Sequence, residues 1–197
     1  MEEWGIEVAS ASCLPRREYL KSPGGTCGWC GITAPVGMEK HAKNGAKKTI
    51  CPLCHLCLHL DVAGHRESGT VIWLPEISQA QLNVLFGVIV GLTIAESKNV
   101  PRDVRERVRS MFVALESRAE VMESIFGAGN QLFDPTHPSF LANQIASQIN
   151  ETDNLNLGGI RLLPRPAYFA PLIRAWGDEV VGKFPVDTWE RVASGHA

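Results

Sequence analysis

The chain has 197 residues, of which 45% are hydrophobic and 20% are charged. This composition supports a buried core and excludes a chain that is disordered throughout. The length allows one ordinary domain with an appendage but not two full domains. Nineteen Lys and Arg residues against twenty-one Asp and Glu residues give a formal net charge of -2, which argues against a general binder of polyanions.

Two segments bear on export and membranes. The chain begins MEEWGIEV, with acidic residues where a signal peptide needs basic residues followed by an apolar run, so we expect a cytoplasmic protein. The most apolar stretch, residues 77–95, has no charge but is densely apolar only over residues 82–95. That is shorter than the roughly 20 residues that cross a bilayer, which favours a buried core helix.

All six cysteines lie in the first third of the chain. Five of them follow the pattern C-x2-C-x20-C-x2-C-x2-C, which without an export signal indicates a metal site rather than disulfides. Two C-x2-C turns supply four thiolates, which surround Zn²⁺ as a tetrahedron with bonds of about 2.3 Å. We therefore predict one structural zinc ion, with a redox dithiol as the weaker alternative. The predicted ligands are Cys27, Cys30, Cys51 and Cys54.

The residues around these cysteines predict the local structure. Gly28 and Gly31 allow a tight first turn. Pro52 suits the first position of a helix, whose N-terminal dipole favours the neighbouring thiolates. The segment is therefore predicted to be a treble-clef-like module: a knuckle, a short hairpin, then a ligand pair at a helix start.

The remaining metal-binding side chains have weaker assignments. Cys57 follows Cys54 by three residues, on the same face of the predicted helix, so it either replaces one ligand or packs beneath the site. His55 and His59 are weaker candidates, because one helix cannot easily present all of these side chains to one ion. Cys13 is predicted to be a free thiol.

Five basic residues or histidines lie between the two cysteine pairs. They either offset the charge of -2 that four thiolates leave around Zn²⁺ or contact a nucleic acid, and the first interpretation is favoured. They are Lys40, His41, Lys43, Lys47 and Lys48.

A helical body is predicted after the module, so the fold class is α+β and mostly helical. Ser78 and Gln81 have the spacing of a capping box, and Pro101 and Gly127 bracket a further helix. The predicted elements in chain order are a strand-like run at 70–74, helix 78–96, a helix between Pro101 and Gly127, a loop to Pro138, a helix at 138–149 and a terminal helix around 168–176.

The chain is predicted to divide into an N-terminal segment with the zinc module (1–68), a helical body (69–181) and a C-terminal tail (182–197). Aromatic anchors dominate protein interfaces, and seams between a small module and a larger body are common docking sites. We therefore expect partner contacts at the predicted seam and in the tail. The residues concerned are Trp73, Leu74, Pro75, Phe184 and Trp189.

Four sequence blocks carry a resemblance to a known family. They are CGWCG, TICPLCHLC, GTVIWLPEISQAQLN and GIRLLP, the last followed by a helix ending at Trp176. In this order they resemble the IcmJ/DotN family over about residues 27–176. That family consists of zinc-binding components of the coupling complex in type IVB (Dot/Icm) secretion systems, with relatives in conjugative transfer systems.

The resemblance implies a non-catalytic adaptor, in which a zinc module of HNH-nuclease-like shape is fused to helices. Such an adaptor docks on the cytoplasmic coupling ATPase, holds a segment from its C-terminal region and meets other components of the complex. It lies at the inner membrane through its partner and does not insert into the membrane itself. The predicted ligands match the family's cysteine pairs, and Cys57 also has a counterpart.

Two other functions remain open. Motifs for phosphate-loop, serine-hydrolase, zinc-protease and dinucleotide chemistry are all missing from the sequence. An HNH endonuclease, active or degenerate, needs a histidine as general base beside a hydrolytic metal, with a further Asn or His that orders the site. The interval between the cysteine pairs offers only His41 and Asn44, without a His-His or Asp-His pair. His59 and His65 follow the second pair and are expected to be ordinary surface or capping residues. A zinc-dependent nucleic-acid-binding module is the other alternative, although nucleic acid is an unlikely partner by charge.

Overall fold

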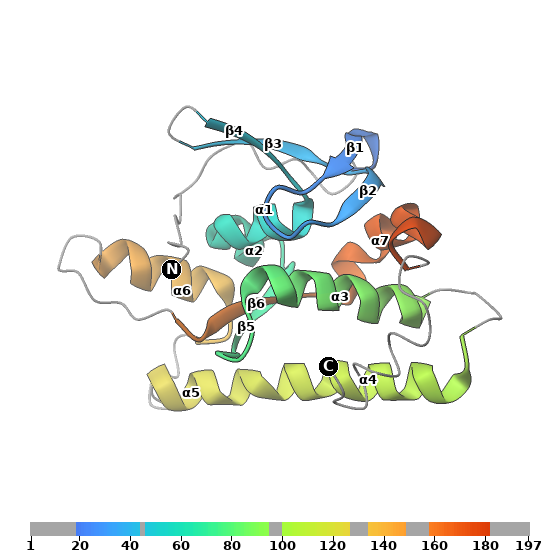
Figure 1. Cartoon of the computed structure of the whole chain (residues 1–197). Helices are drawn as coiled ribbons and strands as arrows, with labels where there is room; N and C mark the ends of the chain where they lie inside the picture. The colour runs from blue at the N-terminus through green and yellow to red at the C-terminus, as the bar shows by residue number, and fades with distance from the viewer. Residues whose placement is uncertain (1–18, 44–45, 95–99, 127–133, 149–157, 182–197) are drawn as a thin grey trace.

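The computed structural model describes residues 19–43, 46–94, 100–126, 134–148 and 158–181, and their arrangement is shown in Figure 1. Helices make up most of this part of the chain, and three antiparallel strand pairs accompany them. The predicted α+β, mostly helical class is confirmed. Among the described helices, none combines the length and apolar character needed to cross a membrane.

The cysteine-rich segment forms two hairpins and two short helices. Strands β1 (Pro23–Thr26) and β2 (Thr33–Val36) pair around the first cysteine turn. Strands β3 (Glu39–Lys43) and β4 (Ala46–Ile50) pair in register from Glu39 opposite Ile50. Helices α1 (Pro52–Leu58) and α2 (Leu60–His65) follow, with Pro52 in the first turn of α1 as predicted. The predicted order of knuckle, hairpin and helix is confirmed; the β1–β2 pair and α2 were not predicted.

A second strand pair lies among the helices. Strand β5 (Gly69–Trp73), predicted at 70–74, pairs antiparallel with β6 (Ile160–Pro164). Arg161 of β6 is buried and holds the turn before helix α3, because its guanidinium donates to the carbonyl of Ile77 at 2.7 Å. The sequence does not predict β6, since an apolar run of this length fits a strand or a buried helix equally well.

Helix α3 (Gln79–Ile94) is the core helix of the body. The Ser78 amide donates to Gln81 Oε1 at 2.8 Å, and the Gln81 amide donates to Ser78 Oγ at 3.2 Å. This reciprocal pair confirms the predicted capping box. Several of its apolar side chains are buried, so the uncharged stretch is a core helix: Leu82, Phe86, Val88, Ile89, Val90 and Leu92.

The remaining helices pack against α3, β5 or α2. Helix α4 (Arg102–Glu116) continues through a 3-10 turn into α5 (Glu120–Phe126), in agreement with the predicted helix between Pro101 and Gly127. Helix α6 (Pro138–Gln148) begins where predicted, and α7 (Pro166–Val181) contains the predicted terminal helix. Helices α4 and α7 pack against α3, whereas α5 packs against β5 and α6 against α2. Figure 1 shows α4 and α5 running along one side of α3, with the β3–β4 hairpin on the other.

One apolar core joins the cysteine segment to the helices. Buried Cys27, Cys51 and Cys54 belong to the same cluster as Phe86 of α3 and Trp176 of α7. The indole of Trp176 also donates a hydrogen bond of 2.9 Å to the carbonyl oxygen of Val36 in β2. Helices α3 and α7 therefore support the cysteine site. The predicted boundary at residue 68 between a zinc module and a helical body stays a prediction.

Candidate metal centre

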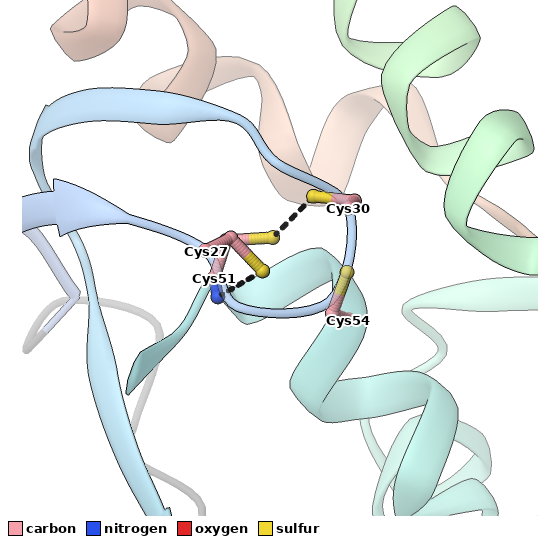
Figure 2. A group of neighbouring side chains, drawn as sticks. All are labelled: Cys27, Cys30, Cys51 and Cys54. Carbon is pink, nitrogen blue, oxygen red and sulfur yellow. Dashed lines mark hydrogen bonds between the residues drawn. The ribbon is translucent and has the colours of Figure 1, made fainter. Parts of the chain in front are cut away.

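Four cysteine sulfurs converge between the first hairpin and helix α1 (Figure 2). Cys27 and Cys30 lie in the turn between β1 and β2, whereas Cys51 is the N-cap of α1 and Cys54 lies in its first turn. Their Sγ atoms all lie within 4.8 Å of one another. Cys30 is half-buried and the other three are buried. The sequence-predicted pairs are thus brought together, and they can hold a metal ion.

Backbone hydrogen bonds fix the first cysteine turn. The Cys27 amide donates to the carbonyl of Ile32 at 2.8 Å, and the Gly31 amide donates to the carbonyl of Cys27 at 3.0 Å. Gly31 has a φ of 77°, a conformation that strains side-chain-bearing residues, so glycine serves here as the sequence predicts. The Gly28 amide donates to the carbonyl of Thr49, which ties the turn to β4.

The sulfur geometry suits tetrahedral Zn²⁺. Two ligands of a tetrahedron with bonds of about 2.3 Å lie about 3.8 Å apart. The Sγ atoms of Cys30 and Cys51 are separated by 3.7 Å. Two of the sulfurs accept hydrogen bonds from N–H groups. The Cys51 amide donates to Cys27 Sγ at 3.3 Å, and Asn83 Nδ2 donates to Cys54 Sγ at 3.3 Å. Such donors stabilise thiolate charge around a bound ion.

Four acidic groups this close cannot all ionise without a cation. Hydrogen bonds with Cys30, Cys51 and Cys54 lower the pKa of the Cys27 thiol. The same contacts act in the opposite direction on Cys54, whose pKa is raised by its interactions with Cys27 and Cys30. A divalent ion between the sulfurs removes this conflict, because it stabilises every thiolate at once. With four sulfur ligands, a bound ion would keep no open position for a substrate, as is typical of structural sites.

A buried polar pair on α3 supports the sulfur cluster, and sequence reasoning missed it. Asn83 accepts a hydrogen bond of 2.9 Å from Gln79 Nε2 while its own amide faces Cys54. Gln79 in turn exchanges two 2.8 Å hydrogen bonds with the backbone of Leu162 in β6. The chain of contacts therefore connects β6 to a metal ligand. The available signal was two polar residues, one helical turn apart, in a helix that is mostly apolar.

Substituting Asn83 by alanine tests this support. Asn83→Ala removes the donor to Cys54 and leaves the buried Gln79 amide with the Leu162 carbonyl as its remaining acceptor, at a cost of about 1–3 kcal/mol in the free energy of unfolding. Loss of an outer-shell partner also lowers metal affinity by roughly 10–100-fold. Urea unfolding and competition with a zinc chelator measure the two effects. Asn143→Ala, at an exposed position of α6, is the matched control; equal behaviour of the two variants would show that Asn83 does not support the centre.

Cys57 is not part of the four-sulfur group. Its thiol is fully buried and donates to the carbonyl of Leu53 at 3.1 Å, with Asn83 as a further neighbour. Burial raises the pKa of the Cys57 thiol to about 12, so the group stays protonated. Of the two alternatives left open by the sequence, packing beneath the site fits this environment. Cys13 lies outside the described residues.

The histidines form a separate group. His41 of β3 meets His55 of α1 and His59, and one ring nitrogen of each lies within 4.8 Å of the others. His59 is fully buried, so it is not a surface residue, but it occupies the cap position between α1 and α2, in agreement with the capping half of the expectation. His65 is exposed, as expected. The four-residue spacing of His55 and His59 contained the signal, because residues four apart share a face of a predicted helix.

The predicted partner residues differ in accessibility. Trp73 is half-buried, Leu74 is buried in a cluster with Ile72 and Leu82, and Pro75 is exposed. Leu74 is therefore corrected from a surface contact to a core residue, because its side chain points into the body. Phe184 and Trp189 lie outside the described residues.

Comparison with known proteins gives one curated relative. No model of a known protein family matches the chain. The chain is 26% identical, over 161 residues, to "Type 4 apparatus protein DotN" of Legionella pneumophila subsp. pneumophila. The match covers 77% of this chain and 72% of that protein.

Proposed function

Because the chain is a relative of the IcmJ/DotN family, we propose that it is a non-catalytic, zinc-stabilised adaptor in the coupling complex of a type IVB secretion or conjugation system. The observation that carries the proposal is the match to DotN, a type 4 apparatus protein, along three quarters of the chain. The sulfur cluster supports it, because a metal held by four cysteines organises a fold and has no position left for substrate.

The proposed ion is a single Zn²⁺ held by the four cysteines of the first and second pairs. The segment that contains them is short and places several buried cysteines in its core. Segments of this kind obtain folding free energy from the metal where a larger domain obtains it from apolar burial. The zinc module thereby gives the adaptor a rigid surface.

The proposed partner is the coupling ATPase, bound through a segment of its C-terminal region, with other components of the complex nearby. The adaptor then lies in the cytoplasm, peripheral to the inner membrane through this partner. The contact residues that remain proposed are Pro75, the accessible part of Trp73, and the tail residues Phe184 and Trp189. A nearly neutral chain with aromatic anchors is expected to bind mainly through apolar contacts.

Titration calorimetry with overlapping C-terminal fragments of the ATPase encoded beside this gene tests the adaptor function. One fragment is expected to bind zinc-loaded protein with micromolar or tighter affinity, and with little dependence on salt. Trp189→Ala is expected to weaken binding by at least about tenfold, because an aromatic anchor contributes about 2 kcal/mol or more. Val113→Ala, at an exposed apolar position of α4, is the control. If no fragment binds folded protein, or binding collapses at moderate salt, the adaptor function is wrong.

One structural feature favours the alternative function, an HNH endonuclease. His41 of the β3–β4 hairpin has two histidine neighbours contributed by α1 and the residue that follows it, where the sequence interval alone offered no pair. His55 and His59 are nevertheless buried among the described residues, which hinders contact with a phosphodiester.

We expect purified protein to leave plasmid DNA uncut in the presence of Mg²⁺, Mn²⁺ or Zn²⁺, since the sulfur centre has no open position and two of the three clustered histidines, His55 and His59, are buried. Gel electrophoresis after long incubation measures this. Cleavage that is abolished by His41→Ala and retained by His65→Ala would establish the nuclease. Retention of DNA at low salt alone would reflect the lysines of the hairpin.

A further inference from the structure

Three histidines from β3, α1 and the residue after α1 form a second group, separate from the four cysteines. The ring centroids of His55 and His59 are 4.8 Å apart, and His41 lies 5.5 Å and 5.8 Å from them. One nitrogen from each ring falls within 4.8 Å of the other two. His55 and His59 are buried and His41 is half-buried, so His41 is the member of the cluster that is accessible from the surface.

We propose that this cluster, His41, His55 and His59, is a second metal site that binds a divalent transition-metal ion, in addition to the zinc ion of the four cysteines. Imidazole nitrogens are suitable ligands for Zn²⁺, Ni²⁺ and Cu²⁺. Bonds of about 2.0–2.1 Å place two tetrahedral nitrogen ligands about 3.4 Å apart. Small rotations of the three side chains from their present spacing bring them to that distance.

Glu39 completes the site as an outer-shell partner. Its carboxylate lies 2.7 Å from His55 Nδ1, and both side chains are almost fully buried. A carboxylate in this position holds the imidazole in one orientation and makes it a more basic ligand. Because Nδ1 contacts Glu39, the metal would bind His55 through Nε2. The same carboxylate supplies a negative charge that offsets the buried cation.

Helix α1 and the two residues that cap it, Cys51 and His59, supply ligands to both sites. Cys51 and Cys54 are three residues apart and belong to the sulfur cluster, whereas His55 and His59 are four apart and belong to the histidine cluster. The two sets of ligands differ in chemistry and in number. Four thiolates fill a tetrahedral coordination sphere, whereas three imidazoles leave at least one coordination position for water. We infer that the histidine site binds its ion more weakly and exchangeably than the sulfur centre does.

Cobalt titration of untagged, zinc-loaded protein tests the second site. Protein dialysed against a mild chelator is expected to keep one zinc ion and then to bind one further Co²⁺. That cobalt is expected to give visible ligand-field absorption without the intense sulfur-to-cobalt charge-transfer band of a thiolate site. His41→Gln is expected to weaken cobalt binding at least tenfold, and Glu39→Gln by roughly 10–100-fold. Retention of the first zinc ion shows that each variant is folded.

His65→Gln is the matched control, because His65 is an exposed histidine at the end of α2 and lies outside the cluster. It should bind cobalt as the wild type does. In wild-type protein, zinc beyond the first equivalent should shift the imidazole ¹⁵N resonances of His41, His55 and His59 and leave that of His65 in place. No cobalt binding below about millimolar concentration, or binding that His41→Gln leaves unchanged, would overturn the second site.

Discussion

Replacing Cys54 by serine is expected to empty the sulfur centre and to unfold the cysteine-rich segment. Cys54 is fully buried in the core that joins this segment to α3 and α7. A serine hydroxyl is a poor ligand for Zn²⁺, and the three remaining sulfurs bind it with much lower affinity. Structural zinc contributes about 10–16 kcal/mol in small zinc modules, which is comparable to the whole stability of a domain. Elemental analysis and thermal unfolding followed by circular dichroism measure the loss.

Cys57→Ser is the control for this variant. Cys57 is equally buried, three residues along the chain, and its sulfur lies outside the cluster. It should retain one zinc ion per chain and lose only about 1–2 kcal/mol, the cost of placing a hydroxyl among apolar neighbours. If Cys57→Ser alone empties the centre while Cys54→Ser does not, the proposed ligand set is wrong.

Trp176→Ala is expected to produce the second large effect, a loss of about 3–5 kcal/mol in the free energy of unfolding. Trp176 is 1% exposed and packs in the core shared by β2, α1 and α3. Its indole N–H also bonds the carbonyl of Val36, so truncation creates a cavity and leaves that carbonyl without this donor. Urea unfolding measures the change. The zinc content at neutral pH should fall only if the variant unfolds.

Two further variants show which part of this loss comes from packing. Trp176→Phe keeps much of the buried apolar surface and loses the hydrogen bond, so we expect a cost between that of the alanine variant and zero. Arg174→Ala changes an exposed position two residues away on α7 and is expected to stay within about 0.5 kcal/mol of wild type. Equal stability of Trp176→Ala and Arg174→Ala would contradict the packing of α7 against the cysteine segment.

The features predictable from the sequence are those fixed by neighbours along the chain. The spacing of Cys27 and Cys30, and of Cys51 and Cys54, determines two ligand turns whatever the rest of the fold does. The capping box at Ser78 and the start of α6 at Pro138 are likewise local. The IcmJ/DotN resemblance rested on such local blocks, and the match to DotN confirms it.

The features that sequence reasoning missed depend on contacts between distant segments. Strand β6 is recognisable only when β5 is placed beside it. Asn83 acquires its role because α3 packs against α1, which brings its amide to Cys54. Likewise, His41 belongs to a different element from His55 and His59, and the hairpin must fold back on the helix before the three meet. The spacing of residues along the chain does not predict these contacts between distant segments.

X-ray absorption at the zinc edge, on untagged protein that retains one zinc ion after dialysis, tests most directly the claim that four cysteines hold the structural metal. The account predicts a first shell of four sulfurs at about 2.3 Å. A shell that contains nitrogen at about 2.0–2.1 Å, and that loses it in His41→Gln, would place the tightly held ion in the histidine cluster. That result would contradict the closed sulfur centre on which the adaptor function depends.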